Sequence, residues 1–370
     1  MSEKKLHIVA LDNPHPADYG GAIDMYYRIK TLAEAGIKIT LHIFYKNRKP
    51  ADEWAGICEE VYSYKRKTGF SGISAKTPYI VYSRRSKKLL NNLLKDNSPI
   101  LFEGIHTCFH LSNKALKKRK KLVRLHNVEH AYYYDLYKNS GNLLKRLYYR
   151  LESDLLCQFE RYLKHADVLF PISHKETKHF KALYSQVVYL SPFSEEKQKP
   201  RNIELENYCI YHGNLSVSEN EKAVFFLINE VFSNLKIKLI IAGKKPGSKI
   251  QSLCNRHPYT SLVANPNKET LEELLSKAKI HVLYSNQDTG IKLKLIESLR
   301  YSGEVIISGE MNDGNMFSKV CHIANNTEEF KSKILALSGS NDTSKQNDKT
   351  AFLEQYFSNQ KNAQIIIEHL

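Results

Sequence analysis

The stretch IHVLYSNQDTGIKLKLIESLRYSGEVIIS, residues 280–308, contains two apolar, strand-like runs with a helix-like segment between them. The runs are Ile280–Tyr284 and Glu304–Ser308, and the segment between them places Ile291 and Leu295 at the spacing of one helix face. A strand, a helix and a second strand in this order form a parallel crossover unit. The stretch therefore predicts an α/β fold.

The start of this predicted helix carries the groups that a phosphate site needs. Asp288 or Thr289 can cap the helix. Gly290, Lys294 and Glu297 follow at i, i+4 and i+7, which predicts that they share a face. Free N–H groups and a lysine suit a diphosphate, and a carboxylate two turns along can accept hydrogen bonds from ribose hydroxyls. An ordinary amphipathic helix with a solvated Lys–Glu pair is the alternative.

The segment GIKLKLIESL, residues 290–299, resembles the donor-nucleotide helix of GT-B fold glycosyltransferases of the family-4 type. Gly290, Lys294 and Glu297 match the form G-x-x-x-K-x-x-E, while Thr289 stands where a second form of the motif has a glutamate. The resemblance implies two Rossmann-like doubly wound domains that face each other across a cleft. It also implies that Gly290, Lys294 and Glu297 bind the donor and that Lys294 is catalytic.

A second strand–helix–strand unit opens the chain. Strands are predicted over Lys5–Leu11 and Ile37–Phe44, with a helix over Ala22–Ala35 between them. Gly20 and Gly21 precede this helix, where backbone N–H groups can approach a phosphate or a reacting sugar. A loop that only requires glycine is the alternative. Because family members carry a glycine pair after their first strand, the resemblance implies that Gly20 and Gly21 contact the donor.

Polar side chains follow two later strands of the first half. One predicted strand ends near Glu103 and is followed by His106. The next is followed by His126 and Glu129. Since open α/β sheets bind ligands at the carboxyl ends of their strands, all four are candidates for a site, with Glu103, His126 and Glu129 expected near the acceptor or in the cleft. On the resemblance, His106 takes the position of a histidine near the reacting sugar, which implies a catalytic role. Histidines satisfied by backbone contacts are the alternative.

The second half repeats the α/β pattern from Tyr208 onward. Its first turn, HGNLSVSENEKAV, resembles the family's turn in which the residue after glycine faces the diphosphate. Here these residues are Gly213 and Asn214, and many relatives have arginine in the place of Asn214. Lys222 is a candidate for the family's downstream lysine.

A polar, proline-containing stretch near residues 195–203 predicts a linker between two domains. The predicted domains are an acceptor-binding domain over residues 1–195 and a nucleotide-sugar-binding domain over residues 204–345. An amphipathic helix is predicted over residues 350–370. In the resembled fold it returns to the first domain.

The charge of the chain favours an acidic partner. Its 370 residues carry a net charge of +16, and residues 84–164 hold 18 basic and 7 acidic side chains. Nucleotide diphosphates, anionic lipid headgroups and nucleic acid all fit a basic surface, and so does plain solubility. No helix-turn-helix, zinc or RNA-binding motif occurs, which disfavours nucleic acid as the partner.

The helix predicted over Asn142–Lys164 has a leucine stripe that includes Leu144, Leu147 and Leu151. Core packing is the favoured interpretation. Because the tyrosine-rich segment AYYYDLY precedes the helix, contact with a membrane surface is the alternative. No apolar run is long enough to span a bilayer and the N-terminus does not have the pattern of a signal peptide. The expected location is cytoplasmic, with a peripheral position at the inner membrane face as the alternative.

These features together predict a glycosyltransferase of the hexosyltransferase type. It would transfer a sugar from a nucleotide diphosphate to a hydroxyl of a glycan or lipid-linked acceptor during cell-surface polysaccharide synthesis. No D-x-D pair occurs in a plausible site, so we expect no metal, and no cofactor other than the donor substrate. The resemblance implies retention of anomeric configuration. The alternatives are a basic nucleic-acid-binding protein, a DNA-modifying glucosyltransferase and a sugar epimerase with the same fold. The six cysteines lack C-x-x-C spacing and are expected to be reduced thiols.

Overall fold

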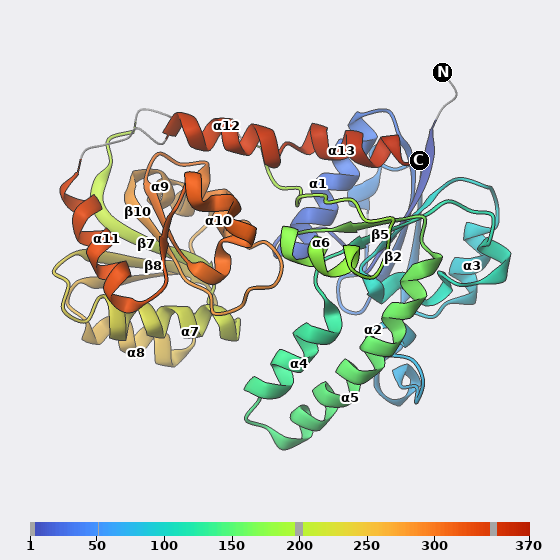
Figure 1. Ribbon diagram of the computed structural model, residues 1–370, viewed down its shortest axis with the longest axis horizontal. Helices are drawn as coiled ribbons and strands as arrows, with labels where there is room; N and C mark the ends of the chain where they lie inside the picture. Colours follow the sequence, from blue (N-terminus) through green and yellow to red (C-terminus); the bar gives the residue numbers. More distant parts are fainter. Residues whose placement is uncertain (1–3, 51, 197–202, 341–345) are drawn as a thin grey trace. The chain divides into compact units, whose positions relative to one another are not determined.

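The computed structural model describes residues 4–50, 52–196, 203–340 and 346–370. The chain divides into two compact units, unit 1 with residues 1–195 and 357–370 and unit 2 with residues 196–356. Each unit contains one six-stranded parallel sheet with helices on its faces (Figure 1).

The strands of unit 1 are β1 (Lys5–Ala10), β2 (Lys38–Tyr45), β3 (Glu60–Lys65), β4 (Ile100–Glu103), β5 (Lys121–Leu125) and β6 (Val168–Pro171). They pair in the order β3-β2-β1-β4-β5-β6, all parallel. The order reverses between β1 and β4, which lie side by side. In such sheets, the loops that leave two strands at the reversal diverge and leave space for a ligand.

The helices of unit 1 are α1 (Gly20–Glu34), α2 (Tyr79–Tyr82), α3 (Lys87–Leu93), α4 (Glu129–Asn139), α5 (Leu143–Phe159), α6 (His174–Lys181) and α13 (Asn359–Glu368). On one face of the sheet, Ile8 packs in a core that includes Met25 of α1 and Ile366 of α13. On the other face, Phe102 packs with Leu89 of α3. Both faces are therefore covered, which explains the continuous apolar runs of the central strands.

Helices α4 and α5 form an antiparallel hairpin that projects from the sheet of unit 1 (Figure 1). The helix predicted over 142–164 corresponds to α5 followed by a 3-10 turn over Glu160–His165. Its leucine stripe is only partly a core stripe. Phe159, at the C-terminal end of the stripe, is buried, but Leu144, Leu147 and Leu151 are exposed. Periodicity locates an apolar face, but it does not show whether another element covers that face.

The strands of unit 2 are β7 (Glu206–Asn214), β8 (Lys238–Lys244), β9 (Thr260–Ala264), β10 (Ala278–Leu283), β11 (Glu304–Ser308) and β12 (His322–Ala324). They pair in the order β12-β11-β10-β7-β8-β9, all parallel. The order reverses between β7 and β10. The helices are α7 (Ser218–Phe226), α8 (Ser248–Arg256), α9 (Lys268–Lys277), α10 (Leu293–Leu299), α11 (Thr327–Gly339) and α12 (Gln346–Tyr356).

The single helix predicted over residues 350–370 is two helices, α12 and α13. The first ends at Tyr356, and Ser358 caps the second, since its hydroxyl accepts a hydrogen bond from the Lys361 N–H. In unit 2, Lys349 of α12 donates a 2.6 Å hydrogen bond to the carbonyl of Gly303. In unit 1, Asn362 of α13 donates to the hydroxyl of Ser191 at 2.8 Å. The C-terminal residues 357–370 thus belong to unit 1.

Within the residues that the structure describes, no helix combines the length and the apolar composition needed to cross a bilayer.

Candidate functional site

The strand reversal of unit 2 brings together the ends of β7 and β10. Gly213 and Asn214 close β7, and the loop after β10 leads through Gly290 into α10, which carries Lys294 and Glu297. These are the residues that the sequence assigns to the donor. Their common position is where an open α/β sheet binds ligands.

Helix α10 begins later than the sequence predicts. Its first residue is Leu293, its N-cap is Lys292, and no side chain caps it. Gly290 has φ +64 and lies in the preceding loop. That left-handed backbone, together with the extended conformation of Lys292, cannot continue a helix. The predicted cap at Asp288 or Thr289 is therefore wrong, and only Lys294 and Glu297 lie on the same helix.

Lys294 is held by two neutral oxygens. Its Nζ donates to the Tyr211 hydroxyl and to Asn220 Oδ1, both at 2.9 Å, and lies 4.6 Å from the centre of the Tyr211 ring. Burial lowers the pKa of Lys294 to about 8, while Glu219 opposes that shift and Lys292 adds to it. The ammonium is thus desolvated, and no carboxylate among the described residues contacts it. An anionic ligand would stabilise its charge.

A second lysine lies in the same region of unit 2. Lys292 Nζ approaches Glu219 Oε1 at 3.1 Å, and this carboxylate also accepts a short hydrogen bond from the Ser285 hydroxyl after β10. Lys292 is therefore neutralised by α7, whereas Lys294 is not. Of the two lysines, Lys294 is the one without a carboxylate partner among the described residues.

Glu297 lies one turn after Lys294 and is half-buried. Its Oε1 accepts a 3.0 Å hydrogen bond from the Tyr301 hydroxyl four residues later. That bond fixes the carboxylate on the face of α10. A carboxylate in a fixed position can accept hydrogen bonds from vicinal hydroxyls with little further loss of side-chain freedom.

Asn220 and Tyr211 complete this cluster, and neither residue is predicted as part of a site from the sequence. Asn220 Nδ2 donates to the Asn214 carbonyl at 2.9 Å, and its Oδ1 accepts from Tyr211 at 3.0 Å. A Cβ atom at Gly213 would lie 3.2 Å from Asn220 Nδ2, so glycine gives this amide room. Tyr211 precedes Gly213 by two positions, and two residues apart on a strand share a face. This alternation along the strand is the sequence feature that could have identified Tyr211.

The side chain of Asn214 itself faces the following turn. Its Oδ1 accepts hydrogen bonds from the Ser216 N–H at 3.2 Å and the Ser216 hydroxyl at 2.8 Å. Asn214 is exposed, as is Lys222 on α7. Lys222 makes none of the contacts described for Lys294. The positive charge of this cluster therefore comes from Lys294.

Two buried histidines fix α10 on the sheet. His212 Nε2 and His281 Nδ1 each lie 3.2 Å from the hydroxyl of Ser298. Burial lowers the pKa of His212 to about 3 and that of His281 well below its usual value. Both rings are thus neutral hydrogen-bond partners, and they position the helix that carries Lys294.

In unit 1, the glycine pair lies at the start of α1, next to the strand reversal. The helix begins at Gly20, after Tyr19, whose side chain makes no capping hydrogen bond. A Cβ atom at Gly21 would lie 3.2 Å from the Tyr19 ring. The first N–H groups of a helix have no partner within the helix, so this terminus can donate to an anion or a hydroxyl.

His106 follows β4 at the same edge of the sheet. Gly104 precedes it with φ +65, and a Cβ atom there would lie 2.8 Å from His106 Nδ1. Nδ1 is buried, and none of the described residues gives it a hydrogen-bond partner. Burial, followed by Arg84 and His126, lowers the pKa of His106 well below its usual value. The ring is therefore neutral at physiological pH.

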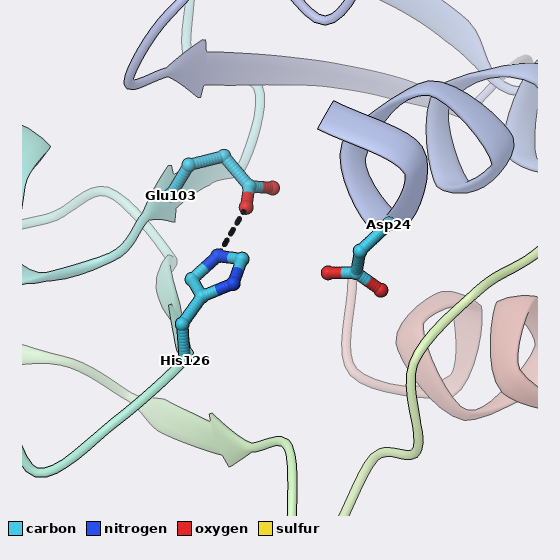
Figure 2. A group of neighbouring side chains, drawn as sticks. All are labelled: Asp24, Glu103 and His126. Carbon is cyan, nitrogen blue, oxygen red and sulfur yellow. Dashed lines mark hydrogen bonds and ion pairs between the residues drawn. The ribbon is translucent and has the colours of Figure 1, made fainter. Parts of the chain in front are cut away.

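Glu103 lies in a buried ion-pair network that the sequence did not reveal (Figure 2). Glu103 makes a short ion pair with Arg28 and lies 3.4 Å from His126 Nε2. Arg28 also pairs with Asp24 at 2.7 Å, and Arg124 approaches Asp24 at 3.3 Å. Burial raises the pKa of Asp24, but Arg124 and Arg28 lower it overall. Glu103 is fully buried, and it contacts the side chains of His126 and Arg28.

Asp24, Glu103 and His126 present ligand atoms within 4.8 Å of one another, a spacing that a metal ion could bridge. Figure 2 shows the two carboxylates approaching from α1 and from the end of β4. Arg28 and Arg124 already bind these carboxylates. Two guanidinium groups supply the positive charge that a cation would bring, so we interpret the group as an internal ion-pair network.

Glu129, the remaining acidic candidate, starts α4 and is buried. Burial raises its pKa to about 7, although a 3.3 Å hydrogen bond from Asn127 opposes the shift. It is thus a carboxyl group that changes protonation near neutral pH, on the same sheet edge as His126. Such groups are frequent at functional sites.

The comparisons with known proteins agree with this architecture. No protein-family model matches the chain. Over 362 residues the chain is 25% identical to an uncharacterised 44.6 kDa protein in the cps region of Klebsiella pneumoniae, covering 90% of each protein. It is similar to a TarM variant of S. aureus solved with fondaparinux, alpha-GlcNAc-glycerol and UDP (TM-score 0.68, 12% identity, 99% of each chain). It is also similar to the lipopolysaccharide outer core galactosyltransferase WaaB (TM-score 0.64, 12% identity, 99% of this chain and 100% of that one). The chain thus has the GT-B fold, with two Rossmann-like units, as the sequence predicts.

Proposed function

We propose that this chain is a glycosyltransferase that moves a sugar from a nucleotide diphosphate to a hydroxyl group of a glycan or lipid-linked acceptor. The fold that it shares with WaaB, a galactosyltransferase, and with the UDP-containing TarM structure supports this proposal. The relative in a cps region supports a place in cell-surface polysaccharide synthesis. A hexose is the proposed transferred sugar and a nucleotide sugar the proposed donor, with no further cofactor.

The observation that carries the proposal is the state of Lys294. A desolvated ammonium held only by the Tyr211 hydroxyl and the Asn220 amide oxygen lies at the strand reversal of unit 2. A diphosphate at this point would receive a charge-assisted hydrogen bond from Lys294. Glu297, one turn along, would accept hydrogen bonds from the ribose. Gly213, Asn214 and Gly290 would allow backbone N–H groups to approach the phosphates.

In the proposed reaction the bond between the sugar C1 and the diphosphate oxygen breaks, and a bond from C1 to the acceptor oxygen forms. Negative charge develops on the leaving diphosphate, where Lys294 stabilises it as an electrostatic catalyst without a metal ion. The acceptor proton moves to the leaving phosphate, and the configuration at C1 is retained. His106, as a neutral ring with a free Nδ1, is the proposed catalytic contact to the sugar, with Gly20 and Gly21 donating backbone hydrogen bonds. His126 and Glu129 are proposed near the acceptor.

A thermal-shift screen with UDP, GDP and ADP sugars tests donor binding. We expect one nucleotide class to raise the melting temperature of the wild type. Lys294→Met and Glu297→Ala should abolish most of that increase. Lys249→Ala, on an exposed lysine of α8, is the matched control and should respond like the wild type. Equal stabilisation of all four proteins would contradict the assignment of the site.

The product distinguishes sugar transfer from epimerisation. A transferase yields the free nucleotide diphosphate and a new glycosidic linkage, whose anomeric proton coupling in NMR reports retention or inversion. An epimerase returns a nucleotide sugar of unchanged mass. Activity that persists in EDTA would support the metal-independent mechanism, whereas full loss that Mg²⁺ reverses would overturn it.

A further inference from the structure

The first half of α5 projects beyond the core of unit 1. The second half is anchored, since Glu152 accepts hydrogen bonds from the N–H groups of Tyr79 and Ile80, both at 2.9 Å, and Ser153 donates to the His130 carbonyl at 2.8 Å. Residues 143–151, in contrast, contact α4 mainly through aromatic rings. They lie beside α4 in the hairpin (Figure 1).

One side of this projecting segment is occupied by α4. Arg146 stacks over Tyr137 at 5.1 Å and Arg150 over Tyr134 at 5.4 Å, and the Tyr149 ring lies 6.1 Å from that of Tyr133. At about 3.6 residues per turn, positions 146, 149, 150 and 153 form one continuous stripe. This stripe is the contact face between the two helices.

The opposite side is apolar and exposed. Leu144 is 81% exposed, Leu147 59% and Leu151 56%, with Leu143 at 78% and Tyr148 at 40% beside them. Single exposed leucines are common on protein surfaces, but a contiguous stripe of four leucines and a tyrosine is not. Tyr148 is partly covered, since its ring lies 6.5 Å from that of Tyr133, whereas the four leucines remain largely exposed among the described residues.

The charge beside the stripe is mainly basic, although Asp154, one turn beyond Leu151, pairs with Arg150 at 3.2 Å. Residues 136–151, LYKNSGNLLKRLYYRL, contain four basic side chains and no acidic one. Lys145 flanks the stripe on one side, and Arg146 and Arg150 flank it on the other. An apolar helix face with basic flanks is typical of helices that lie in the interface of an anionic bilayer, where leucines enter the acyl region and basic groups contact the headgroups.

We propose that the exposed face of α5, formed by Leu143, Leu144, Leu147, Tyr148 and Leu151, docks on an anionic lipid bilayer surface. A second copy of the chain is disfavoured as the occupant, because a two-fold interface would place this basic hairpin against an identical one. The proposal rests on the proposed function in one respect. A lipid-linked acceptor would be the reason for the enzyme to contact a membrane.

Vesicle flotation with the full chain tests the proposal. We expect binding to vesicles of phosphatidylcholine and phosphatidylglycerol, weaker binding at high salt, and little binding to phosphatidylcholine alone. Leu144→Ser, Leu147→Ser and Leu151→Ser together should reduce binding at least about tenfold. The control carries Leu183→Ser and Leu335→Ser, at leucines that are 57% and 56% exposed, and should bind like the wild type. Equal binding of all three proteins, or no binding by the wild type, would overturn the proposal.

A fluorescence probe gives a second readout that does not depend on removing apolar groups. The chain has one tryptophan, Trp54, which is 1% exposed and provides a constant background. Leu147→Trp should shift its emission to the blue on anionic vesicles, and Leu335→Trp should not. A shift in both variants, or in neither, would count against docking through α5.

Two further outcomes separate this inference from the proposed function. Vesicle binding needs no nucleotide sugar, so a chain that binds vesicles but no nucleotide sugar disproves only the proposed function. A chain that binds a nucleotide sugar but no vesicles disproves only the docking surface. A wild-type dimer that the leucine variant converts to a monomer, without vesicle binding, would assign the face to a second copy instead.

Discussion

At the scale of single residues, the chemistry of the proposed donor site depends on how poorly one ammonium is neutralised. Lys292 pairs directly with Glu219, but the described hydrogen bonds of the Lys294 ammonium go to two neutral oxygens, the Tyr211 hydroxyl and Asn220 Oδ1. Burial lowers the pKa of Lys294 to about 8. Its charge is therefore costly in the free protein and is stabilised when an anion binds.

This state predicts a pH dependence of nucleotide binding. UDP keeps its charge above about pH 7, since the second pKa of a phosphate is about 6. The affinity of the wild type for UDP should fall as the pH rises through about 8, because Lys294 loses its proton there. Lys294→Met should bind more weakly and show no such fall. Titrations between pH 7 and 9.5 measure this, and a parallel decline in both proteins would contradict the role of Lys294.

The same lysine affects stability with the opposite sign. Its pKa is lowered in the folded protein, so the unfolded chain binds more protons between about pH 8 and the ordinary lysine pKa. The free energy of unfolding should therefore rise with pH across that window. In Lys294→Met this rise should be smaller, as measured by urea unfolding at several pH values.

The buried ion-pair network gives a residue-scale prediction for unit 1. Arg124→Met removes one partner of Asp24 and leaves an uncompensated charge in the core, so it should destabilise the fold by about 3–5 kcal/mol. Lys277→Met, which breaks an exposed pair with Glu273, is the control and should cost less than about 1 kcal/mol. Chemical denaturation compares the two. Similar small losses would show that Asp24 does not depend on Arg124.

At the scale of elements, backbone geometry at the strand ends positions the candidate side chains. Gly104 combines φ +65 with a close approach to His106. Gly104→Ala should therefore destabilise unit 1 by about 1–3 kcal/mol. Gly36→Ala has the same kind of backbone, φ +84, but no atom within 4 Å of the added Cβ, so it should cost less. Equal losses in the two variants would mean that the contact with His106 contributes nothing.

Single elements differ in how far the sequence predicts them. Central strands such as β1 and β11 were predictable because burial on both faces requires continuous apolar runs. The start of α10 was not, because glycine adopts left-handed and right-handed backbone about equally, so the sequence does not reveal the positive φ of Gly290. Tyr211 and Asn220 were missed for another reason, since they meet Lys294 across 83 and 74 positions of sequence. The leucines of α5 show that a stripe at helical spacing does not reveal what lies against it.

At the scale of the whole molecule, the two units repeat one plan. In each sheet the strand order reverses once, between β1 and β4 in unit 1 and between β7 and β10 in unit 2. In each unit several candidate residues lie at, or after, the C-terminal ends of the two strands at that reversal. Gly20, Gly21 and His106 do so in unit 1, and Gly213, Asn214 and Lys294 in unit 2. This shared placement links the fold to the proposed sugar transfer.

Calorimetric titration of the stabilising nucleotide sugar into the wild type, Lys294→Met and Lys249→Ala measures what Lys294 contributes to donor binding. A charge-assisted hydrogen bond is worth about 1.5–3 kcal/mol, so we expect a dissociation constant about 10- to 150-fold higher for Lys294→Met than for the other two proteins. Equal dissociation constants for all three, or no binding of any nucleotide sugar by the wild type, would contradict this expectation.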